Sequence, residues 1–375
     1  MLSTSQETFS DLIAIVNDPQ GLTTKTLSCI RPLTDRIRLV LCLAGTRSSD
    51  VAGVSLAGRT PAACRLTPAL DAELLVLGRQ THGGAMPRSP AGVVSPVVIT
   101  RACAGLFAWP ITIVDCGVFQ QPRTQFITLG DLVAECISTG AAQDRAHVNR
   151  LFERGIALGK ELARTCDCLV LAECVPGGTT TAYAVLTLLG YKIAGCVSSS
   201  LPAGNHEVKQ KLVEAGLKRL KLEHPSFQED PFAALAAMGD PMQAVVAGMT
   251  VAAGATVPVL LAGGSQMLAV YALLTAHCPE LERTIPKLAV CTTKWVVLDK
   301  SADTLRLSQL VKAPLASACI DLSKSQHAAL RAYEEGHVKE GCGAGAALLL
   351  AALSGAYCEA EIIKAIDVAY DELMD

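Results

Sequence analysis

Residues 169–189, "LVLAECVPGGTTTAYAVLTLL", join two apolar stretches through an acid, a Pro-Gly-Gly turn and three threonines. The first stretch has the length and composition of a buried strand, and the second those of a buried helix. A strand that leads through a short turn into a helix is the repeating unit of a parallel α/β sheet. Glu173 ends the strand, where a carboxylate is costly to bury without partners. This junction therefore indicates both a fold class and a candidate site.

The same alternation of strand and helix runs through most of the chain. Helices are expected over residues 143–164 and after Thr179, Asn205, Asp240 and Ser265. Short apolar runs predict interior strands over residues 37–45, 72–78, 111–117, 168–173, 192–197, 257–264 and 294–299. We therefore predict an α/β fold with a Rossmann-like, mostly parallel sheet and helices on both of its faces.

Both ends of the chain have helical patterns. Residues 5–18, "SQETFSDLIAIVND", are expected to form a helix, and after about Ser301 the strand pattern stops. Three further helical segments follow it towards the C-terminus. Because the two ends of one domain often lie close together, we predict an α/β core of residues 36–300 and a small helical domain formed by residues 1–35 and 301–375.

Small apolar residues dominate the composition. Half of the residues are hydrophobic but only 4% are aromatic, so Ala, Val, Leu and Gly must build a closely packed core. The net charge of −3 provides no basic field for nucleic acid or an anionic membrane.

Residues 241–278 contain no Asp, Glu, Lys or Arg, but glycines and a proline interrupt them. We expect two buried helices around a short strand there, and a cytoplasmic protein.

The fifteen cysteines form no recognisable disulfide framework, because their number is odd and they are scattered among apolar runs. This distribution favours free thiols in a reducing compartment. The segment "CDCLVLAEC", with Cys166, Cys168 and Cys174, raises the alternative of a metal site. It contains no C-x-x-C pair, and no histidine lies at ligand spacing nearby, so we expect neither a metal nor a cofactor.

Three glycine-rich loops, "ECVPGGTTTA", "LAGGSQM" and "KEGCGAGA", follow strand-like runs or open helices. Glycine lets backbone N–H groups approach a ligand, and a helix N-terminus favours an anion. A tight turn with a threonine N-cap explains one such loop without a ligand. Three in one chain favour a phosphate, and the absence of P-loop and dinucleotide patterns favours a single one. The residues expected to bind the substrate are Gly177, Gly178, Thr179, Thr180, Thr181, Gly263, Gly264, Ser265, Gly341 and Gly343.

Two lysines and a second acid extend the candidate site. Lys209 and Lys211 follow another predicted strand and could neutralise a phosphate, although a solvated helix face explains either lysine alone. Glu340 lies directly before the apolar segment "GCGAGAALLLAAL". It is either an acid that interacts with the helix dipole or a general base whose pKa is raised by an apolar pocket. Spacing alone favours the first of these two interpretations.

These motifs resemble those of the nicotinate-nucleotide:dimethylbenzimidazole phosphoribosyltransferase family, and more closely those of its divergent archaeal and cyanobacterial branch. The family pattern Glu-Met-Gly-Ile-Gly-Asn-Thr-Thr is similar to "ECVPGGTT", which begins at Glu173. The family pattern Gly-Glu-Gly-Ser-Gly-Ala is similar to "KEGCGA", which contains Glu340. Residues 95–106 and 111–118 look like the segments that line the family's aromatic-base pocket. The resemblance covers roughly residues 95 to 350.

The resemblance implies an enzyme that transfers phosphoribose from nicotinate mononucleotide to an aromatic base such as 5,6-dimethylbenzimidazole, in assembly of the cobalamin lower ligand. It implies that Glu340 is the catalytic base and that Glu173 holds the ribose or supports positive charge at its anomeric carbon. It also places Thr100 and Arg101 near the base pocket. A homodimer without a cofactor is expected from the resemblance, with no nucleic-acid or membrane partner.

Four residues depart from the family pattern at important positions. Gly178 replaces an Asn, Val175 and Pro176 replace Gly-Ile, and Lys339 replaces the Gly before the catalytic base. The missing amide at position 178 changes the expected phosphate contacts, and a lysine beside Glu340 would hold down the pKa of that base. A non-catalytic nucleotide-binding relative and a phosphoribosyltransferase for another aromatic base therefore stay open as alternatives.

Overall fold

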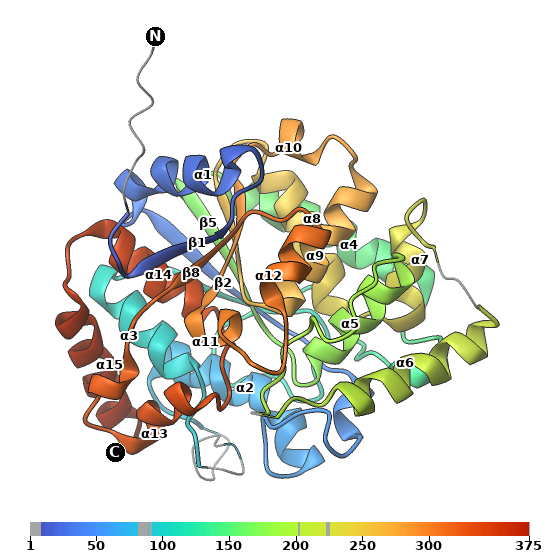
Figure 1. Ribbon diagram of the computed structural model, residues 1–375, viewed down its shortest axis with the longest axis horizontal. Coiled ribbons are helices and arrows are strands. Elements are labelled where there is room, and N and C mark those ends of the chain that lie inside the picture. The colour runs from blue at the N-terminus through green and yellow to red at the C-terminus, as the bar shows by residue number, and fades with distance from the viewer. Residues whose placement is uncertain (1–8, 82–88, 90–91, 202, 223–225, 375) are drawn as a thin grey trace.

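The computed structural model describes residues 9–81, 89, 92–201, 203–222 and 226–374. One eight-stranded sheet, with the order β1-β8-β7-β6-β5-β2-β3-β4, runs through the molecule (Figure 1). All neighbouring strands in it are parallel except β1 and β8, which pair antiparallel. The strands are β1 (Ile13–Asn17), β2 (Ile37–Leu43), β3 (Ile111–Asp115), β4 (Ile127–Thr128), β5 (Cys168–Cys174), β6 (Val259–Ala262), β7 (Leu288–Thr293) and β8 (Leu315–Ala318).

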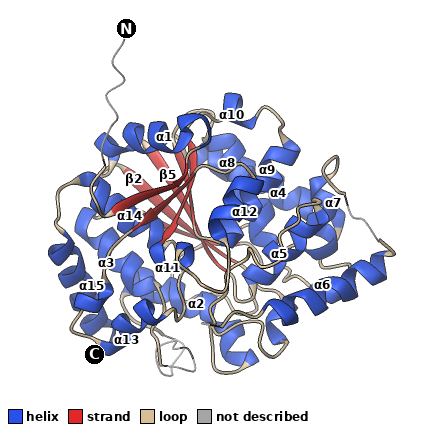
Figure 2. Ribbon diagram, viewed as in Figure 1, coloured by secondary structure: helices blue, strands red, loops and turns tan. Residues whose placement is uncertain are grey.

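Helices cover both faces of the sheet, as Figure 2 shows for the red strands between blue helices. Alternate residues of β2 point into two separate cores, with Val40 and Cys42 in one and Leu39 and Leu41 in the other. The helices are α1 (Leu22–Ile30), α2 (Pro61–Leu77), α3 (Val97–Phe107), α4 (Arg145–Leu162), α5 (Gly178–Leu188), α6 (His206–Leu220), α7 (Pro231–Met238), α8 (Pro241–Ala253), α9 (Ser265–His277), α10 (Leu281–Thr284), α11 (Lys294–Val297), α12 (Thr304–Leu310), α13 (Ala328–Arg331), α14 (Ala344–Ser354) and α15 (Glu359–Met374).

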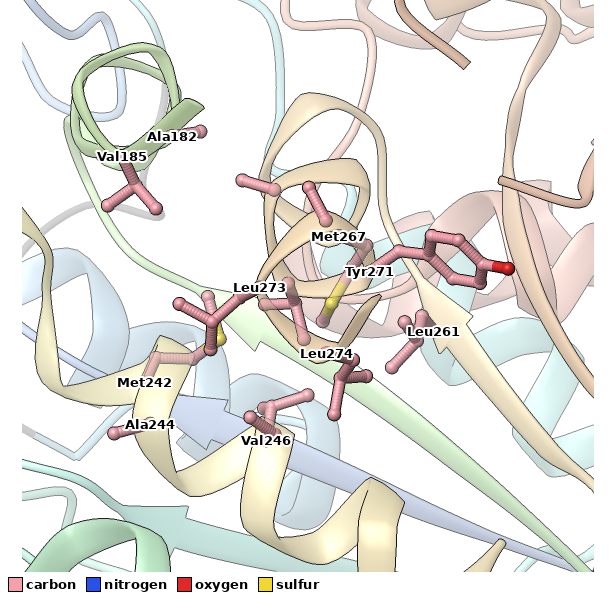
Figure 3. Packing of buried hydrophobic residues seen from close by; sticks show 14 of the residues in the cluster. Ala182, Val185, Met242, Ala244, Val246, Leu261, Met267, Tyr271, Leu273 and Leu274 are labelled. Atoms are coloured by element: carbon pink, nitrogen blue, oxygen red, sulfur yellow. The ribbon is translucent and has the colours of Figure 1, made fainter. Parts of the chain in front are cut away.

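Small residues allow the helices of the first core to approach closely. A Cβ atom on Gly155 of α4 would lie 2.4 Å from the carbonyl oxygen of Val245 in α8, and one on Gly248 would lie 2.2 Å from that of Phe152. The two helices thus meet backbone to backbone. Figure 3 shows the neighbouring part of this core, where apolar side chains of α5, α8, α9 and β6 fill the space between the elements. The low aromatic content follows from this packing, since large rings would not fit between helices this close.

Most of the predicted architecture is confirmed. The parallel sheet with helices on both faces is present, and β2, β3, β5 and β6 lie where strands were predicted. The predicted helices correspond to α4, α5, α6, α8 and α9. The uncharged residues 241–278 form α8, β6 and α9, which are largely buried. None of the helices in the described ranges has both the length and the apolar character needed to cross a bilayer. All fifteen cysteines are free thiols.

Three predicted strands are wrong. Residues 72–78 belong to α2, which begins with Pro61 after a Thr60 side chain that accepts a hydrogen bond from the N–H of Ala63. Residues 192–197 form no strand, because Gly195 adopts a left-handed backbone conformation (φ 70°). The strand expected over residues 294–299 lies earlier, as β7. Thr293 ends it and caps the short helix α11 with its side chain.

The expected N-terminal helix is also wrong, because its described part contains β1. Ile13 pairs with Ala318 and Asn17 with Leu315, which makes β1 the antiparallel edge of the sheet. Its partner β8 was missed as well, since its sequence "LASA" is short and only weakly apolar. The division into residues 36–300 and a helical domain from both ends stays a prediction, but these two strands extend the same sheet as the core.

Candidate active site

A cavity of about 140 Å³ lies at the carboxyl ends of the central strands. Ligands bind at this edge in open parallel sheets, because loops there lead from strands into helix N-termini. The cavity wall comes from six parts of the chain that are far apart in sequence. Its residues include Val54, Ser55, Leu56, Ala57, Thr67, Asp71, Ser89, Val93–Pro96, residues 173–179, Ser200, Gln266, Val338 and residues 340–342.

Glu173 lies at the end of β5 and lines this cavity. Its Oε2 atom accepts a hydrogen bond of 3.0 Å from the N–H of Val175. Burial raises the pKa of Glu173 to about 8, and the nearby charges of Asp240 and Glu340 act in the same direction. This carboxyl is therefore mostly protonated at neutral pH.

The loop after Glu173 brings backbone to the cavity at the start of α5. Gly177, Gly178 and Thr179 line the wall, and α5 begins at Gly178. Gly177 has a φ of 85°, a conformation that favours glycine. The N–H groups of Gly178 and Thr180 already donate to the carbonyl oxygens of Val175 and Gly177, each at 2.8 Å. The positive end of the α5 dipole still favours an anion at this turn.

The other two threonines of the loop do not line the cavity. Thr181 Oγ1 donates a hydrogen bond of 2.5 Å to Asp240 Oδ2, and so ties α5 to the start of α8. Thr180 is fully buried, and its Oγ1 atom has no hydrogen-bond partner in the part of the chain that is described. Of the two hydroxyls, that of Thr181 therefore fixes the loop through its hydrogen bond to Asp240.

Gln266 supplies an amide beside the loop. A Cβ atom on Gly178 would lie 2.2 Å from Gln266 Nε2, so the glutamine side chain takes the space that a side chain at position 178 would need. Its Nε2 atom donates to Asp240 Oδ2 at 3.2 Å, and its Oε1 atom accepts from Gln243 Nε2 at 3.2 Å. The family's Asn is thus absent from position 178, and an amide from α9 lies in the same place.

Glu340 is held in the wall of the same cavity by four hydrogen bonds. Its Oε2 atom accepts from Thr292 Oγ1 at 3.0 Å and from the N–H of Thr293 at 2.9 Å. Its Oε1 atom accepts from the N–H groups of Gly341 at 3.2 Å and Gly345 at 3.1 Å. Burial nevertheless raises the pKa of Glu340 to about 7, because desolvation outweighs these donors. This is the range in which a carboxylate can act as a general base near neutral pH.

The loop that carries Glu340 is strained and is joined to the strand of Glu173. Val338, Lys339 and Cys342 have φ values of 66°, 70° and 53°, a region that non-glycine residues rarely adopt. The N–H of Cys342 donates to the carbonyl oxygen of Glu173 at 2.9 Å. Two acids that are far apart in sequence therefore line one cavity, as the glycine-rich motifs predicted.

Lys339 does not act on Glu340 in the expected way. Its ammonium group points to the opposite side, where it lies 2.9 Å from Asp299 Oδ2 and donates to the carbonyl oxygens of Ser199 at 2.7 Å and Leu201 at 2.8 Å. Both members of this ion pair are buried, with 3% and 1% of their side chains exposed. The pKa of Glu340 is raised and not lowered, so the expectation from sequence adjacency was wrong.

The two predicted phosphate-binding lysines lie outside the cavity wall. Lys209 is fully buried, and its Nζ atom donates to the carbonyl oxygen of Ser198 at 2.7 Å. Burial, together with the charge of Lys339, lowers the pKa of Lys209 to about 7. Lys211 is exposed on α6. The carbonyl that Lys209 contacts lies two residues before Ser200, which does line the cavity.

The remaining predicted residues surround the cavity or lie elsewhere. Gly341 lines the wall. Gly263 packs against Glu173, Gly343 packs against Ala172 of β5, and Gly264 lies against Val296. Ser265 accepts a hydrogen bond from the N–H of Ser198.

Thr100 donates to the carbonyl oxygen of Cys342 at 3.0 Å, behind the Glu340 loop. Arg101 lines a different groove, beside Trp109 and Tyr357, and the structure does not bring it to this cavity.

Four residues of the site and its surroundings were not among the predicted site residues: Asp71, Gln266, Ser200 and Asp240. Asp71 lies inside α2, just before the run that was predicted as a strand, and is 2% exposed. Gln266 lies within the predicted glycine-rich loop "LAGGSQM" and could have been included with its neighbours. The loop around His82 and Arg88, considered from sequence as a mobile segment, lies outside the described residues.

Comparisons with known proteins agree with this architecture. A family model described as phosphoribosyltransferase matches residues 100–288. A UPF0284 protein of Microcystis aeruginosa (strain NIES-843 / IAM M-2473) is 42% identical over 334 residues, which are 87% of this chain and 90% of the relative. UPF0284 protein alr0297 of Nostoc sp. (strain PCC 7120 / SAG 25.82 / UTEX 2576) is 40% identical over 371 residues, which are 92% and 96% of the two chains.

Two solved structures from Thermus thermophilus share the fold. One is described as nicotinate-nucleotide-dimethylbenzimidazole phosphoribosyltransferase, with a TM-score of 0.59, 17% identity and coverage of 93% of this chain and 89% of that one. The other is described as CobT, with a TM-score of 0.61, 18% identity and coverage of 93% and 90%. At such identities the likeness concerns the fold alone.

Proposed function

The chain belongs to the nicotinate-nucleotide:dimethylbenzimidazole phosphoribosyltransferase family, and from this premise we propose that it transfers the phosphoribosyl group of nicotinate mononucleotide to an aromatic base. The products are nicotinate and an α-ribazole-type phosphate, as used for the cobalamin lower ligand. 5,6-Dimethylbenzimidazole is the base that we propose first, because the similar fold from Thermus thermophilus is described with that substrate.

One observation carries the proposal. Glu173, the backbone at the start of α5 and Glu340 line the same cavity, although Glu340 follows Glu173 by 167 residues in the chain. This arrangement offers an anion site, an acid for the sugar and a base within one space. Holding two reactants side by side in such a space supplies much of the acceleration of a transfer reaction.

The phosphate of the mononucleotide would bind at the N-terminus of α5, against the backbone of Gly177, Gly178 and Thr179. The ribose would then lie towards Glu173. Nicotinate mononucleotide carries a cationic pyridinium, and a nearby positive charge favours the ionised form of a carboxyl. Substrate binding would therefore lower the pKa of Glu173 from its raised value and allow it to stabilise positive charge at the anomeric carbon.

The departing nicotinate needs no acid, because its ring nitrogen becomes neutral when the bond to the anomeric carbon breaks. The attacking base needs one proton acceptor, because its second ring nitrogen must lose a proton as the first forms the new bond. Glu340 would take that proton. Attack on the face opposite to nicotinate inverts the anomeric carbon, which converts a β-linked nucleotide into an α-linked one.

Glu340 must exchange a hydrogen bond to accept this proton. Four donors already occupy the roughly four lone-pair positions of its carboxylate. Three of these donors are fixed backbone N–H groups, and only the Thr292 hydroxyl can rotate away. We propose that Thr292 releases Glu340 when the base binds.

The test incubates the protein with nicotinate mononucleotide and 5,6-dimethylbenzimidazole and measures released nicotinate. Wild-type protein should release it, and Glu340→Gln should reduce the rate by about 10²–10⁴-fold, the usual contribution of a general base. Binding of the mononucleotide, measured by calorimetry, should change little in this variant. Glu361→Gln, which alters an exposed acid on α15, is the matched control and should leave both values unchanged.

Three results would redirect the proposal. Mononucleotide binding without nicotinate release for any azole would favour the non-catalytic alternative. Release with a different aromatic base only would keep the reaction type and change the acceptor. Full activity of Glu340→Gln would remove Glu340 from the mechanism.

A further inference from the structure

Three metal-ligating side chains meet beside the candidate active site. Asp71 comes from α2, Cys174 from the end of β5 and Cys342 from the loop before α14. All three are buried and line the cavity, and their ligand atoms lie within 4.8 Å of one another. Sequence spacing could not reveal this group, because Asp71 and Cys174 are 103 residues apart and Cys342 is 271 residues from Asp71.

The distances within this group match those of a tetrahedral metal site. Cys174 Sγ and Cys342 Sγ each lie 3.4 Å from Asp71 Oδ2. In a tetrahedral zinc site, with zinc–sulfur bonds of about 2.3 Å and zinc–oxygen bonds of about 2.0 Å, neighbouring sulfur and oxygen ligands are about 3.5 Å apart. As thiols, both cysteines donate hydrogen bonds to Oδ2 at these distances, which are close to the sulfur–oxygen spacing that such an ion requires.

The second carboxylate oxygen of Asp71 provides an independent indication of a ligand. Asp71 Oδ1 is buried and meets no donor at full hydrogen-bond geometry within the described ranges, although the Ser95 side chain interacts with this carboxylate and acts to lower its pKa. An unsatisfied buried polar atom is costly, and each one in a native structure needs an explanation. Among the described residues that line this cavity there is no Lys, Arg or His, while Asp71, Glu173 and Glu340 are all acidic. The wall thus has acids in excess and no side-chain cation of its own.

We propose that Asp71, Cys174 and Cys342 bind one divalent cation of the zinc type. The carboxylate and two thiolates are the three protein ligands, and each thiol loses its proton as the metal–sulfur bond forms. The fourth position faces the cavity, and water or a lone pair of a bound molecule fills it. This is the ligand number of catalytic zinc sites, whereas structural sites are closed by four protein ligands. The site shares its cavity with the phosphoribosyl transfer proposed above, but metal content and absorption test it without any measurement of that activity.

The experiment measures metal binding directly. Protein purified under reducing conditions is stripped with a chelator, dialysed against zinc or cobalt(II), and analysed for metal content and absorption. We expect one ion per chain and, with cobalt, the intense thiolate-to-metal charge-transfer bands of sulfur ligation. Removal of a group that merely supports a ligand costs about 10–100-fold in metal affinity. Loss of a direct ligand in Cys174→Ser or Cys342→Ser should therefore cost at least about 100-fold.

Two controls separate this site from other thiols. Cys103→Ser removes a buried thiol of α3, and Cys358→Ser removes an exposed thiol near the C-terminus; both should bind like wild type. Asp71→Asn keeps the shape of the side chain, which guards against a folding defect, and should weaken binding while the circular dichroism spectrum stays unchanged. Less than about a tenth of an ion per chain, or equal binding by the Cys174→Ser/Cys342→Ser double variant, would overturn the proposal.

Discussion

Gly178 has no side chain, and the Gln266 amide occupies the space that a side chain at this position would need. The Gln266 amide is 2% exposed and is fixed by contacts with Asp240 and Gln243, so it cannot easily move aside. A side chain at position 178 would have to displace it. The glycine is therefore required by the neighbouring amide, and its replacement of the family's Asn does not remove an amide from the site.

Gly178→Ala should destabilise the protein by about 1–3 kcal/mol, the usual cost of adding a methyl group to a filled interior. Mononucleotide affinity should fall as well, because Gln266 must leave its position beside the loop. Urea unfolding and calorimetry measure the two effects. Gly105→Ala is the control, since nothing lies within 4 Å of the added Cβ atom on this exposed helical glycine. It should stabilise the protein by about 0.5–1 kcal/mol. Equal effects of the two changes would contradict the role of Gln266.

For single residues, the sequence was informative at strand–helix junctions, where glycines let the backbone approach a ligand. Gly177, Gly178 and Glu173 could be selected because glycines and acids at strand–helix junctions are unusual and have few explanations. Glu340 was placed in the site by the family resemblance, since its spacing alone favoured an acid that interacts with the helix dipole. Asp71 could not be predicted, because it lies within a helix that is buried on all sides. Only tertiary packing brings it to the cavity.

The Lys339–Asp299 ion pair fixes the position of the loop between α13 and α14. Asp299 also accepts hydrogen bonds from Ser198 Oγ at 2.6 Å and from the N–H and hydroxyl of Ser301 at 2.9 and 2.7 Å. Lys339 itself has a left-handed backbone conformation, which costs of order 1–3 kcal/mol and persists only when the surroundings enforce it. The ion pair and the two carbonyl contacts of the ammonium group enforce it here.

Lys339→Met should destabilise the protein by about 3–5 kcal/mol, because it leaves the Asp299 carboxylate buried without its cation. The double change Lys339→Met/Asp299→Asn should recover part of this loss. Arg145→Met is the control, because it removes an ion pair with Asp230 whose side chains are 42% and 53% exposed, and should cost no more than about 1 kcal/mol. Denaturant unfolding compares the variants, and a small effect of Lys339→Met would show that the loop is held by other contacts.

Whole elements were predictable where their hydrophobic pattern was distinct. β2 and β5 are apolar runs of the length of a buried strand, each interrupted by one charged residue, and α4 has one polar face. The run 72–78 was mistaken for a strand. Residues 72–75 of α2 are buried on every side, so the sequence shows no polar face repeating with the period of a helix. β1 and β8 were missed because a short edge strand buries little apolar surface and leaves a weak pattern.

Over the whole molecule, the alternation of strands and helices was sufficient to predict the fold class and the edge of the sheet at which the cavity lies. It could not predict which loops would meet there. That depends on the strand order, in which β5 and β6 are neighbours in the middle of the sheet, and on α14, which packs against β6, β7 and β8.

The buried lysine of α6 should make global stability depend on pH. Its pKa is about 7 in the folded protein, through burial and the charge of Lys339 and against the attraction of Asp299, and 10.5 is its ordinary value. Between these two values the unfolded chain binds more protons, so the unfolding free energy should rise with pH, by up to about 1.4 kcal/mol per unit. The loss of unfolding free energy caused by burying the charged form of Lys209 is full below pH 7 and absent above about 10.5.

Lys209→Met removes this contribution and should flatten the rise between about pH 7 and 9, measured by urea unfolding at several pH values. Lys211→Met, which alters an exposed lysine of the same helix, should keep the wild-type slope. Parallel curves for wild type and Lys209→Met would contradict the lowered pKa of Lys209.

The antiparallel pairing of β1 with β8 has a consequence for biosynthesis. Ile13 pairs with Ala318, so the first strand leaves the ribosome about 300 residues before its only sheet neighbour exists. At a translation rate of about 5–20 residues per second this delay lasts about 15–60 s. Until β8 is made, β1 lacks the strand with which it pairs, and forming that pairing closes a loop of about 300 residues. Synthesis of β8 therefore determines when β1 can join the sheet.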